Sequence, residues 1–295
     1  MSLRTLLRSS ESERGQIHIG GRLDGHRVVV PLLAGEPAGI VDQIRVGVAI
    51  ASARGGSVRV EDPVANAETA YRTITPNAEP ESVSLLLEWA LDRGNEPGDR
   101  VDGILAARRT ERRVHEQVRR DEADTLILPR STGSGTLGRR RLRRIAHRAP
   151  CNVIWINGEP GFREFASILL PIADGPHSGL ATDVAGAIAQ NVDAYVDILH
   201  VVPTEAEEAV KVAADEQLDA AKSRIDLGDQ ANPWILQSDN PAETIAEQSN
   251  YYGLTVIGAP TAGRLRQLVY GSTSQSIRSA AQNMVIATRT PETLR

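Results

Sequence analysis

The sequence contains the same succession of short apolar runs twice, and this internal repeat limits the fold more than any other feature. Three pairs of runs align in the same order, at offsets of 140, 130 and 132 residues: 30–32 with 170–172, 125–127 with 255–257, and 149–154 with 281–286. Runs that recur at nearly constant spacing are the signature of a repeated structural unit. We therefore predict a tandem duplication of a unit of about 130–140 residues.

The repeat divides the chain of 295 residues into three segments. Residues 1–26 precede the first copy, match nothing in the second, and are expected to be a mobile N-terminal extension. The first copy is predicted to span residues 27–158 and the second residues 159–295, with a Gly- and Pro-rich linker over residues 157–161. Two domains also agree with the length of the chain.

Each copy alternates short apolar runs with stretches that have a helical pattern. The predicted strands are 27–33, 57–60, 101–106, 125–128 and 152–156 in the first copy, and 168–172, 194–202, 234–237, 254–258 and 284–288 in the second. The predicted helices of the second copy are 178–190, 206–226, 241–251 and 272–281. This alternation predicts an α/β fold made of two tandem doubly wound parallel-sheet, Rossmann-like domains. In such sheets ligands bind beyond the carboxyl ends of the strands.

Composition places the chain among soluble globular proteins, with 41% hydrophobic and 24% charged residues. The single cysteine, Cys151, excludes an internal disulfide and any multi-cysteine metal site. The six histidines have no metal-ligand spacing, so no structural metal is expected. No apolar run approaches the roughly 18 residues of a membrane span, and the polar N-terminus lacks a signal-peptide core. We therefore expect a cytoplasmic protein that does not insert into a membrane.

Charge is distributed unevenly between the two copies. Residues 1–158 carry 24 Arg against 20 acidic residues, a net charge of +4, and residues 159–295 carry 9 basic against 18 acidic residues, a net charge of −9. This is not the basic footprint of a nucleic-acid-binding protein, so no nucleic-acid partner is expected. The lysines, Lys211 and Lys222, do not lie in a GK[ST] context, which excludes P-loop nucleotide hydrolysis.

One stretch of the second copy could bind a phosphate group. A predicted strand ends at Gly258, and a loop of small residues then leads to Gly271-Ser272-Thr273 at the start of a predicted helix. Glycine allows backbone N–H groups to approach a phosphate, while hydroxyl groups and the helix dipole favour an anion at a helix start. A glycine turn followed by a Ser/Thr helix cap explains the same residues without a ligand. The residues alone leave both interpretations open.

This stretch resembles the G-x2-G-x9-G-[S/T] signature of the universal stress protein family. The first Gly of the signature falls on Gly258 and the last Gly-Ser on Gly271-Ser272, whereas Thr261 takes the place of the middle Gly and Gly263 follows two residues later. Residues 147–153, 200–202 and 238–245 are similar to further junctions of the family. The resemblance covers the chain from residue 27 onwards, twice over. It implies a fold similar to the adenine-nucleotide alpha-hydrolases.

The resemblance implies a site for ATP or another adenine nucleotide or anion, in the C-terminal copy at most. The implied binding residues are Ile172, Ala173, Asp174, Val201, Gly258, Gly263, Gly271, Ser272 and Thr273. Family members that bind ATP place an Asp two residues after the first-strand Pro. Here Ala173 occupies that position in the second copy, with Asp174 one step later, and Leu33 occupies it in the first.

The first copy also departs from the phosphate signature. Arg139-Arg140 stands where the second copy has Gly271-Ser272, and arginine does not allow the close backbone approach that glycine does. We therefore predict that the first copy is a degenerate, structural partner of the second.

The family resemblance also implies how the copies assemble. The last strands, 152–156 and 284–288, should meet at a pseudo-twofold axis, with Trp155 opposite the smaller Ala287. The resemblance implies in addition that the chain pairs with itself as a homodimer. A weaker similarity to the stress-protein domains attached to amino-acid transporters implies a membrane transporter or signalling protein as a further partner.

No catalytic acid–base pair or nucleophile is evident, so the expected function is a stress-response or regulatory one rather than an enzymatic one, with slow incidental ATP hydrolysis as the most turnover we expect. A rival hypothesis is a ligand-free interaction module that acts through the basic helix 139–148, in which Leu142 and Ile145 form a buried face. A second rival, a nucleotidyl-transfer enzyme, has His177 alone in its favour.

Two local patterns in the second copy predict how helices begin. Ser178 is predicted to cap the helix after the first strand of the second copy. Asn240-Pro241 with Glu243 has the pattern of a helix start, with a cap, Pro in the first turn and an acid near the positive end of the helix dipole.

Overall fold

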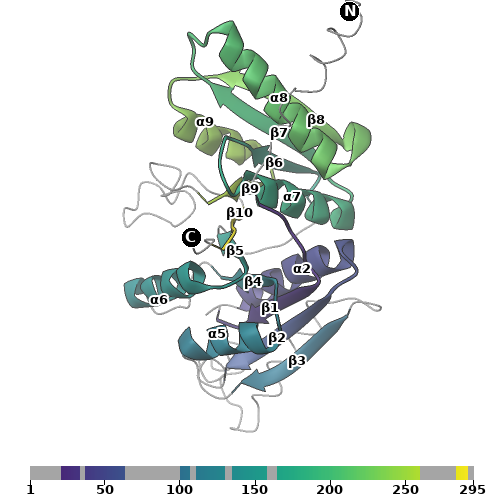
Figure 1. Ribbon diagram of the computed structural model, residues 1–295, viewed down its shortest axis with the longest axis vertical. Coiled ribbons are helices and arrows are strands. Elements are labelled where there is room, and N and C mark those ends of the chain that lie inside the picture. The colour runs from purple at the N-terminus through teal and green to yellow at the C-terminus, as the bar shows by residue number, and fades with distance from the viewer. Residues whose placement is uncertain are drawn as a thin grey trace, which may run out of the picture.

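The computed structural model describes residues 21–33, 37–63, 100–106, 111–129, 135–157, 165–259 and 284–291. Within these ranges one ten-stranded sheet runs through the molecule, with helices on both of its faces (Figure 1). The helices of this part of the chain are too short or too polar to cross a membrane.

The N-terminal half contributes five parallel strands in the order β3-β2-β1-β4-β5. Its elements are β1 (Arg27–Pro31), α2 (Pro37–Ala53), β2 (Ser57–Pro63), β3 (Val101–Ala106), α5 (Glu111–Arg120), β4 (Thr125–Leu128), α6 (Gly135–Arg148) and β5 (Asn152–Asn157). The chain passes outward from β1 to β3 and then returns to the other side of β1 with β4. This reversal is the switch point of a doubly wound sheet.

The C-terminal half repeats this strand order in the opposite direction, β10-β9-β6-β7-β8. Its elements are β6 (Ser167–Pro171), α7 (Ser178–Val192), β7 (Tyr195–Val202), α8 (Glu208–Ile225), β8 (Ala231–Gln237), α9 (Pro241–Gln248), β9 (Leu254–Gly258) and β10 (Met284–Arg289). The predicted doubly wound α/β class is therefore confirmed. The helix predicted over residues 272–281 lies outside the described residues.

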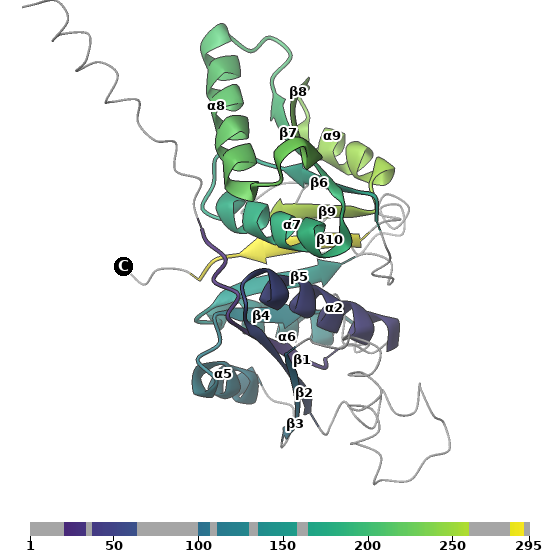
Figure 2. The ribbon, with the colours of Figure 1, turned by 90° about the vertical axis from the view of Figure 1, so that its right-hand side faces the viewer.

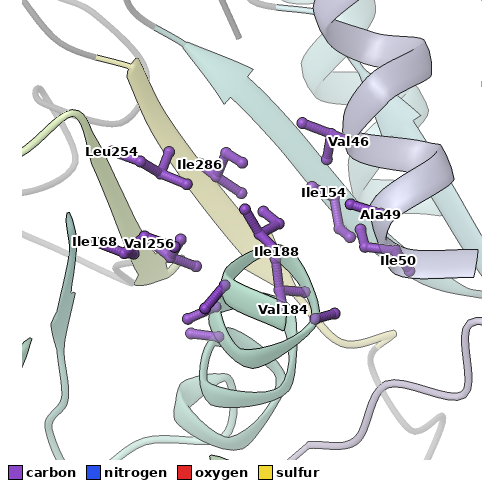
Figure 3. Packing of buried hydrophobic residues seen from close by; sticks show 14 of the residues in the cluster. Val46, Ala49, Ile50, Ile154, Ile168, Val184, Ile188, Leu254, Val256 and Ile286 are labelled. Carbon is purple, nitrogen blue, oxygen red and sulfur yellow. The ribbon is translucent and has the colours of Figure 1, made fainter. Parts of the chain in front are cut away.

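The two halves join through an antiparallel pair of strands, β5 and β10. Trp155 lies opposite Ala287 in this pair, as the sequence predicts, so a large side chain faces a small one across the junction. On one face of the sheet, α2 and α7 pack against each other, and their apolar residues join those of both halves in one buried cluster (Figure 3). The junction is thus continuous in both the sheet and the core.

The register of β4 and β9 corrects one part of the sequence alignment. Thr125 pairs with Val28 and, in the other half, Leu254 pairs with Ile168, so Leu254 rather than Thr255 is equivalent to Thr125. The two Thr-x-Ile triplets have similar letters, but successive strand residues point to opposite faces of a sheet. An alignment that is wrong by one residue therefore exchanges the two faces of the strand.

The start of α9 lies where it was predicted, with Asn240 at the N-cap position and Pro241 and Glu243 in the first turn, but the Asn240 side chain makes no capping hydrogen bond, and its amide donates to the Glu243 carboxylate. The start of α7 differs from the prediction. His177 occupies the N-cap position without a side-chain capping hydrogen bond, while the Ser178 hydroxyl donates to the Ala173 carbonyl oxygen, 2.6 Å away. Ser178 therefore closes the preceding turn and does not cap the helix.

The basic helix α6 packs as its sequence pattern predicts. Leu142 and Ile145 are buried, and the described arginine side chains along the helix are exposed. The arginine stems follow the helix surface while the charged groups reach solvent. Arg289, at the end of β10, donates to the Ala146 carbonyl oxygen in the last turn of α6, so this helix end is held by the other half.

Residues 21–26 differ from the mobile extension that we expected. Leu23 is buried in the cluster shared by the two halves. The Asp124 carboxylate, which precedes β4, accepts the backbone N–H groups of Gly25, His26 and Arg27. The repeat comparison missed this segment because the contacts are made with residues far away in the sequence.

Candidate functional site

The candidate site lies at the carboxyl edge of the C-terminal half, where β6 and β9 diverge. These strands pair through Ile168 with Leu254 and Leu169 with Thr255 near their beginnings. Beyond these pairs the chain continues into the loop after β6 on one side and to Gly258 on the other. A ligand at the switch point would lie between these two segments.

The loop after β6 brings together three of the residues implied by the resemblance. Ile172 is buried, and its N–H donates to the Leu199 carbonyl oxygen at 2.9 Å, which fixes the start of the loop to β7. Ala173 and Asp174 follow and are exposed at the sheet edge. The loop therefore offers backbone groups and one exposed carboxylate, Asp174, to a ligand.

Gly258 has a packing requirement that the sequence did not reveal. A Cβ atom at this position would lie 3.2 Å from the carbonyl carbon and 3.3 Å from the Cβ of His177. The start of α7 therefore presses against the end of β9, and any larger residue at Gly258 would displace it. His177 also accepts the Thr290 backbone N–H at Nδ1, which ties this turn to the end of β10.

The loops after β7 and β8 form the outer border of the same edge. Val201 lies half-buried near the end of β7. The Thr204 N–H donates to the Asp239 carboxylate at 3.0 Å, which holds the two loops together. Of the nine implied site residues, the structure thus places Ile172, Ala173, Asp174, Val201 and Gly258 along one edge. Gly263, Gly271, Ser272 and Thr273 lie outside the described residues.

The same position in the N-terminal half is closed by a side chain from α2. Gln43 is buried, and its amide nitrogen donates to the carbonyl oxygens of Pro31 at 3.3 Å and Ile127 at 3.4 Å. These oxygens belong to β1 and β4, whose described pairing is limited to Val28 with Thr125 and Val29 with Leu126. Gln43 therefore bridges the point where the two strands diverge.

The equivalent residue of α7 cannot make this bridge. Gln43 and Ala181 lie the same number of residues before Val58 and Val196, which pair with equivalent residues of β1 and β6. Ala181 is buried and carries no polar group. The carbonyl groups at the divergence of β6 and β9 therefore receive no side-chain amide from this position. The sequence analysis missed this difference between Gln43 and Ala181, because the repeat was recognised from its strands and the helices between them were not compared.

Replacing Gln43 by alanine should destabilise the protein by about 1–3 kcal/mol, because the Ile127 and Pro31 carbonyl oxygens would lose the buried amide donor, although the Pro31 oxygen would keep the Leu33 N–H. Urea unfolding of the variant measures the change. Gln190→Ala, at an exposed position of α7, is the matched control and should change stability by less than about 0.5 kcal/mol. Equal effects of the two variants would contradict a bridging role for Gln43.

Two other titratable groups, Cys151 and His200, are poor candidates for chemistry. Burial raises the pKa of the Cys151 thiol to about 12, and the nearby Asp124 carboxylate adds to the effect. The thiol is therefore neutral near pH 7, and a neutral thiol is a weak nucleophile. Burial also lowers the pKa of His200. Within the described ranges no group of three or more His, Cys, Asp or Glu residues could hold a metal ion.

Comparison with known proteins identifies the half of the chain that carries this edge. Residues 164–289 match the model of the Universal stress protein family. The C-terminal half contains a universal stress protein domain. The match includes β6 to β10 and therefore both segments that flank the switch point of this domain. No curated protein matches the chain.

Solved structures resemble the whole described architecture, beyond this one domain. One is a universal stress protein from Archaeoglobus fulgidus DSM 4304. The match covers 92% of this chain and 98% of that chain, with a TM-score of 0.54 and 10% identity. A protein of unknown function from Pseudomonas aeruginosa PAO1 covers 89% over 92% of its own, with a TM-score of 0.51 and 15% identity. At such identities the likeness concerns the fold. The fold of both halves is thus shared with these two solved structures.

Proposed function

We propose that the chain is a tandem universal-stress-protein-like regulatory protein that binds ATP or another adenine nucleotide at its C-terminal copy. In this proposal residues 27–158 form a degenerate copy without a ligand, and residues 159–295 form the binding copy. The loop at Ile172–Asp174 and the end of β9 at Gly258 border the nucleotide. Gly263, Gly271, Ser272 and Thr273 supply the phosphate-binding loop.

The contrast between Gln43 and Ala181 carries this proposal. Rossmann-like sheets bind ligands where the central strands diverge. Gln43 already satisfies the carbonyl groups at that point in the N-terminal half. Ala181 supplies no polar side chain to the corresponding point of the C-terminal half. One site per chain is therefore expected rather than two.

The Asp174 carboxylate determines which ligand groups this edge of the sheet could hold. Its carboxylate is exposed at the sheet edge, one residue beyond the position at which ATP-binding relatives of the resemblance place an Asp. A carboxylate at this edge can hold a ribose hydroxyl or a magnesium ion that accompanies a phosphate chain. The proposal therefore assigns binding and sensing to this edge and no bond-breaking step.

Native mass spectrometry of the freshly purified chain tests the proposal. We expect one adenine nucleotide per chain, or uptake of one ATP when ATP and magnesium are added. Gly271→Glu should abolish this uptake, because a carboxylate would repel the phosphate groups. Ser134→Glu, at a residue just before α6 in the sequence of the N-terminal copy, is the matched control and should leave one nucleotide bound.

Three results would contradict the proposal. A wild-type chain that takes up no ATP, AMP or cyclic AMP would exclude nucleotide sensing, and the arginine face of α6 would then be the surface to test for a protein partner. Two nucleotides per chain would contradict the assignment of the N-terminal copy as closed. Unchanged uptake by Gly271→Glu would place the ligand elsewhere.

A further inference from the structure

Residues 21–25 cross from the C-terminal half to the N-terminal half before β1 begins. In Figure 2 the purple segment that leads into β1 passes over the junction, beside the ends of α7 and α2. At its beginning Gly21 lies against the turn that precedes α7. A Cβ atom on Gly21 would lie 2.7 Å from Thr290 Cγ2 and 3.0 Å from the Pro176 carbonyl oxygen. Gly21 also has a φ of +86°, which few residues other than glycine adopt.

A buried carboxylate on α7 holds the middle of this segment. Asp183 accepts the Leu23 N–H at 2.8 Å, and its side chain is 5% exposed. Arg224, near the end of α8, donates to both oxygens of the Asp183 carboxylate, at 2.7 and 2.8 Å, and also to the Gly21 carbonyl oxygen. One buried ion pair therefore fixes two backbone groups of the segment.

The other end of the segment is fixed to the N-terminal half. The Asn152 side-chain amide, at the start of β5, donates to the Arg22 carbonyl oxygen at 2.8 Å. Gly25 donates its N–H to Asp124. The Leu23 side chain is 1% exposed within the cluster that both halves share. Consecutive residues are thus bound to different halves.

We propose that residues 21–25 act as a clasp that couples nucleotide binding in the C-terminal copy to the junction with the N-terminal copy. This inference rests on the proposed function, because the coupled ligand is the one proposed there. The loop from Ile172 to His177 has the candidate site on one side and the clasp, through Pro176, on the other. The loop is therefore the element that both can influence.

Close packing around Gly21 makes nucleotide binding and docking of the clasp favour each other. Gly21 has no free space toward Pro176 or Thr290, so the clasp can dock only when the turn before α7 has the observed shape. A nucleotide that contacts the backbone at Ala173 and Asp174 orders the same loop. Binding should therefore stabilise the docked clasp, and docking should raise nucleotide affinity by the same factor.

Two variants undock the clasp from outside the proposed binding residues. Gly21→Val introduces a side chain where none fits, and Arg224→Met removes the donor to Gly21 and Asp183 while it keeps an apolar stem of similar length. Arg112→Met, which removes an exposed ion pair with Glu116 in α5, is the matched control. Isothermal titration with ATP and magnesium, and separately with cyclic AMP, measures affinity for each chain.

We expect both clasp variants to bind the nucleotide at least about fivefold more weakly than the wild type, and the control to bind it equally. Hydrogen exchange of the wild-type chain, with and without the nucleotide, should show slower exchange of residues 21–25 in the bound state. This second measurement needs no variant and decides the question even if the substitutions prevent folding.

The outcomes separate the two proposals. Nucleotide binding with unchanged exchange at residues 21–25, or with unchanged affinity in a folded clasp variant, overturns the coupling and leaves the proposed function standing. Failure of the wild type to bind any of the nucleotides overturns both. Faster exchange in the bound state would also overturn the proposal, because the clasp would then release when the ligand binds.

Discussion

Replacing Trp155 by alanine should lower the free energy of unfolding by about 3–5 kcal/mol, the usual cost of removing a buried aromatic side chain. Trp155 is 6% exposed and lies in β5, opposite Ala287 of β10. Because Ala287 is small, it cannot fill the space that the indole ring would leave. Urea unfolding, followed by circular dichroism, measures the loss.

Trp234→Ala is the matched control for this variant. Trp234 lies half-buried in β8, at the edge of the sheet and far from the junction in strand order. We expect a smaller loss of stability and one cooperative transition in the control. In Trp155→Ala we expect the larger loss but still one transition, because α2 and α7 keep the two halves joined through a cluster that does not contain Trp155. A single transition with a loss below about 1 kcal/mol would show that β5 and β10 do not depend on Trp155.

Glu61→Leu should make the protein more stable at alkaline pH by up to about 4–5 kcal/mol. Glu61 is 2% exposed on β2, and its Oε1 has no hydrogen-bond partner in the structure. Burial raises the pKa of Glu61 from 4.5 to about 8; nearby Asp121 also raises this pKa, and Arg59 lowers it. In the C-terminal half the equivalent residue is Leu199, so the substitution restores the apolar residue of the other copy.

The sign of the pH effect follows from the two pKa values. Between pH 4.5 and about 8 the folded state keeps the Glu61 proton and the unfolded state releases it. The contribution of the Glu61 proton to the free energy of unfolding is fully present below pH 4.5. As the pH rises above 4.5, the free energy of unfolding falls by about 1.4 kcal/mol per pH unit until the pH reaches the folded pKa. Glu61→Leu removes this slope.

Urea unfolding at several pH values between 5 and 9 checks the prediction. Glu122→Gln is the matched control, since Glu122 forms an exposed ion pair with Arg27 in the same half and should leave the slope unchanged. If the wild type and Glu61→Leu lose stability in parallel as the pH rises, Glu61 is ionised in the folded state and the prediction is wrong.

The repeated pattern of apolar runs predicted much of the architecture correctly. Strands buried on both faces are short apolar runs that begin and end at turn residues. The sequence therefore predicts strands β1 to β10. The pairing of Trp155 with Ala287 could also be predicted, because the family resemblance placed the last strands together. The register of β9 could not be predicted from the sequence. The two similar triplets allow a shift of one residue, and the residue types do not show which face of the sheet each residue occupies.

Prediction of the candidate site was less complete for a related reason. Ile172, Ala173, Asp174, Val201 and Gly258, which the family resemblance implies, lie at or near the ends of strands that a parallel sheet gathers at one edge, and their role in binding stays a prediction. The packing of Gly258 against His177 was missed, because these residues belong to separate strand–helix units. Gly263, Gly271, Ser272 and Thr273 remain predictions from the sequence.

The sequence by itself determined the elements, their order and the doubly wound sheet, because local periodicity and turn residues act over a few neighbouring positions. Only the tertiary structure decided that Gln43 closes one copy, that Asp183 and Arg224 hold residues 21–25, and that Glu61 is buried without a hydrogen-bond partner for Oε1. These contacts join residues that are 12 to 203 positions apart in the chain. Their energies depend on burial and on matching partners, which no local pattern in the sequence records.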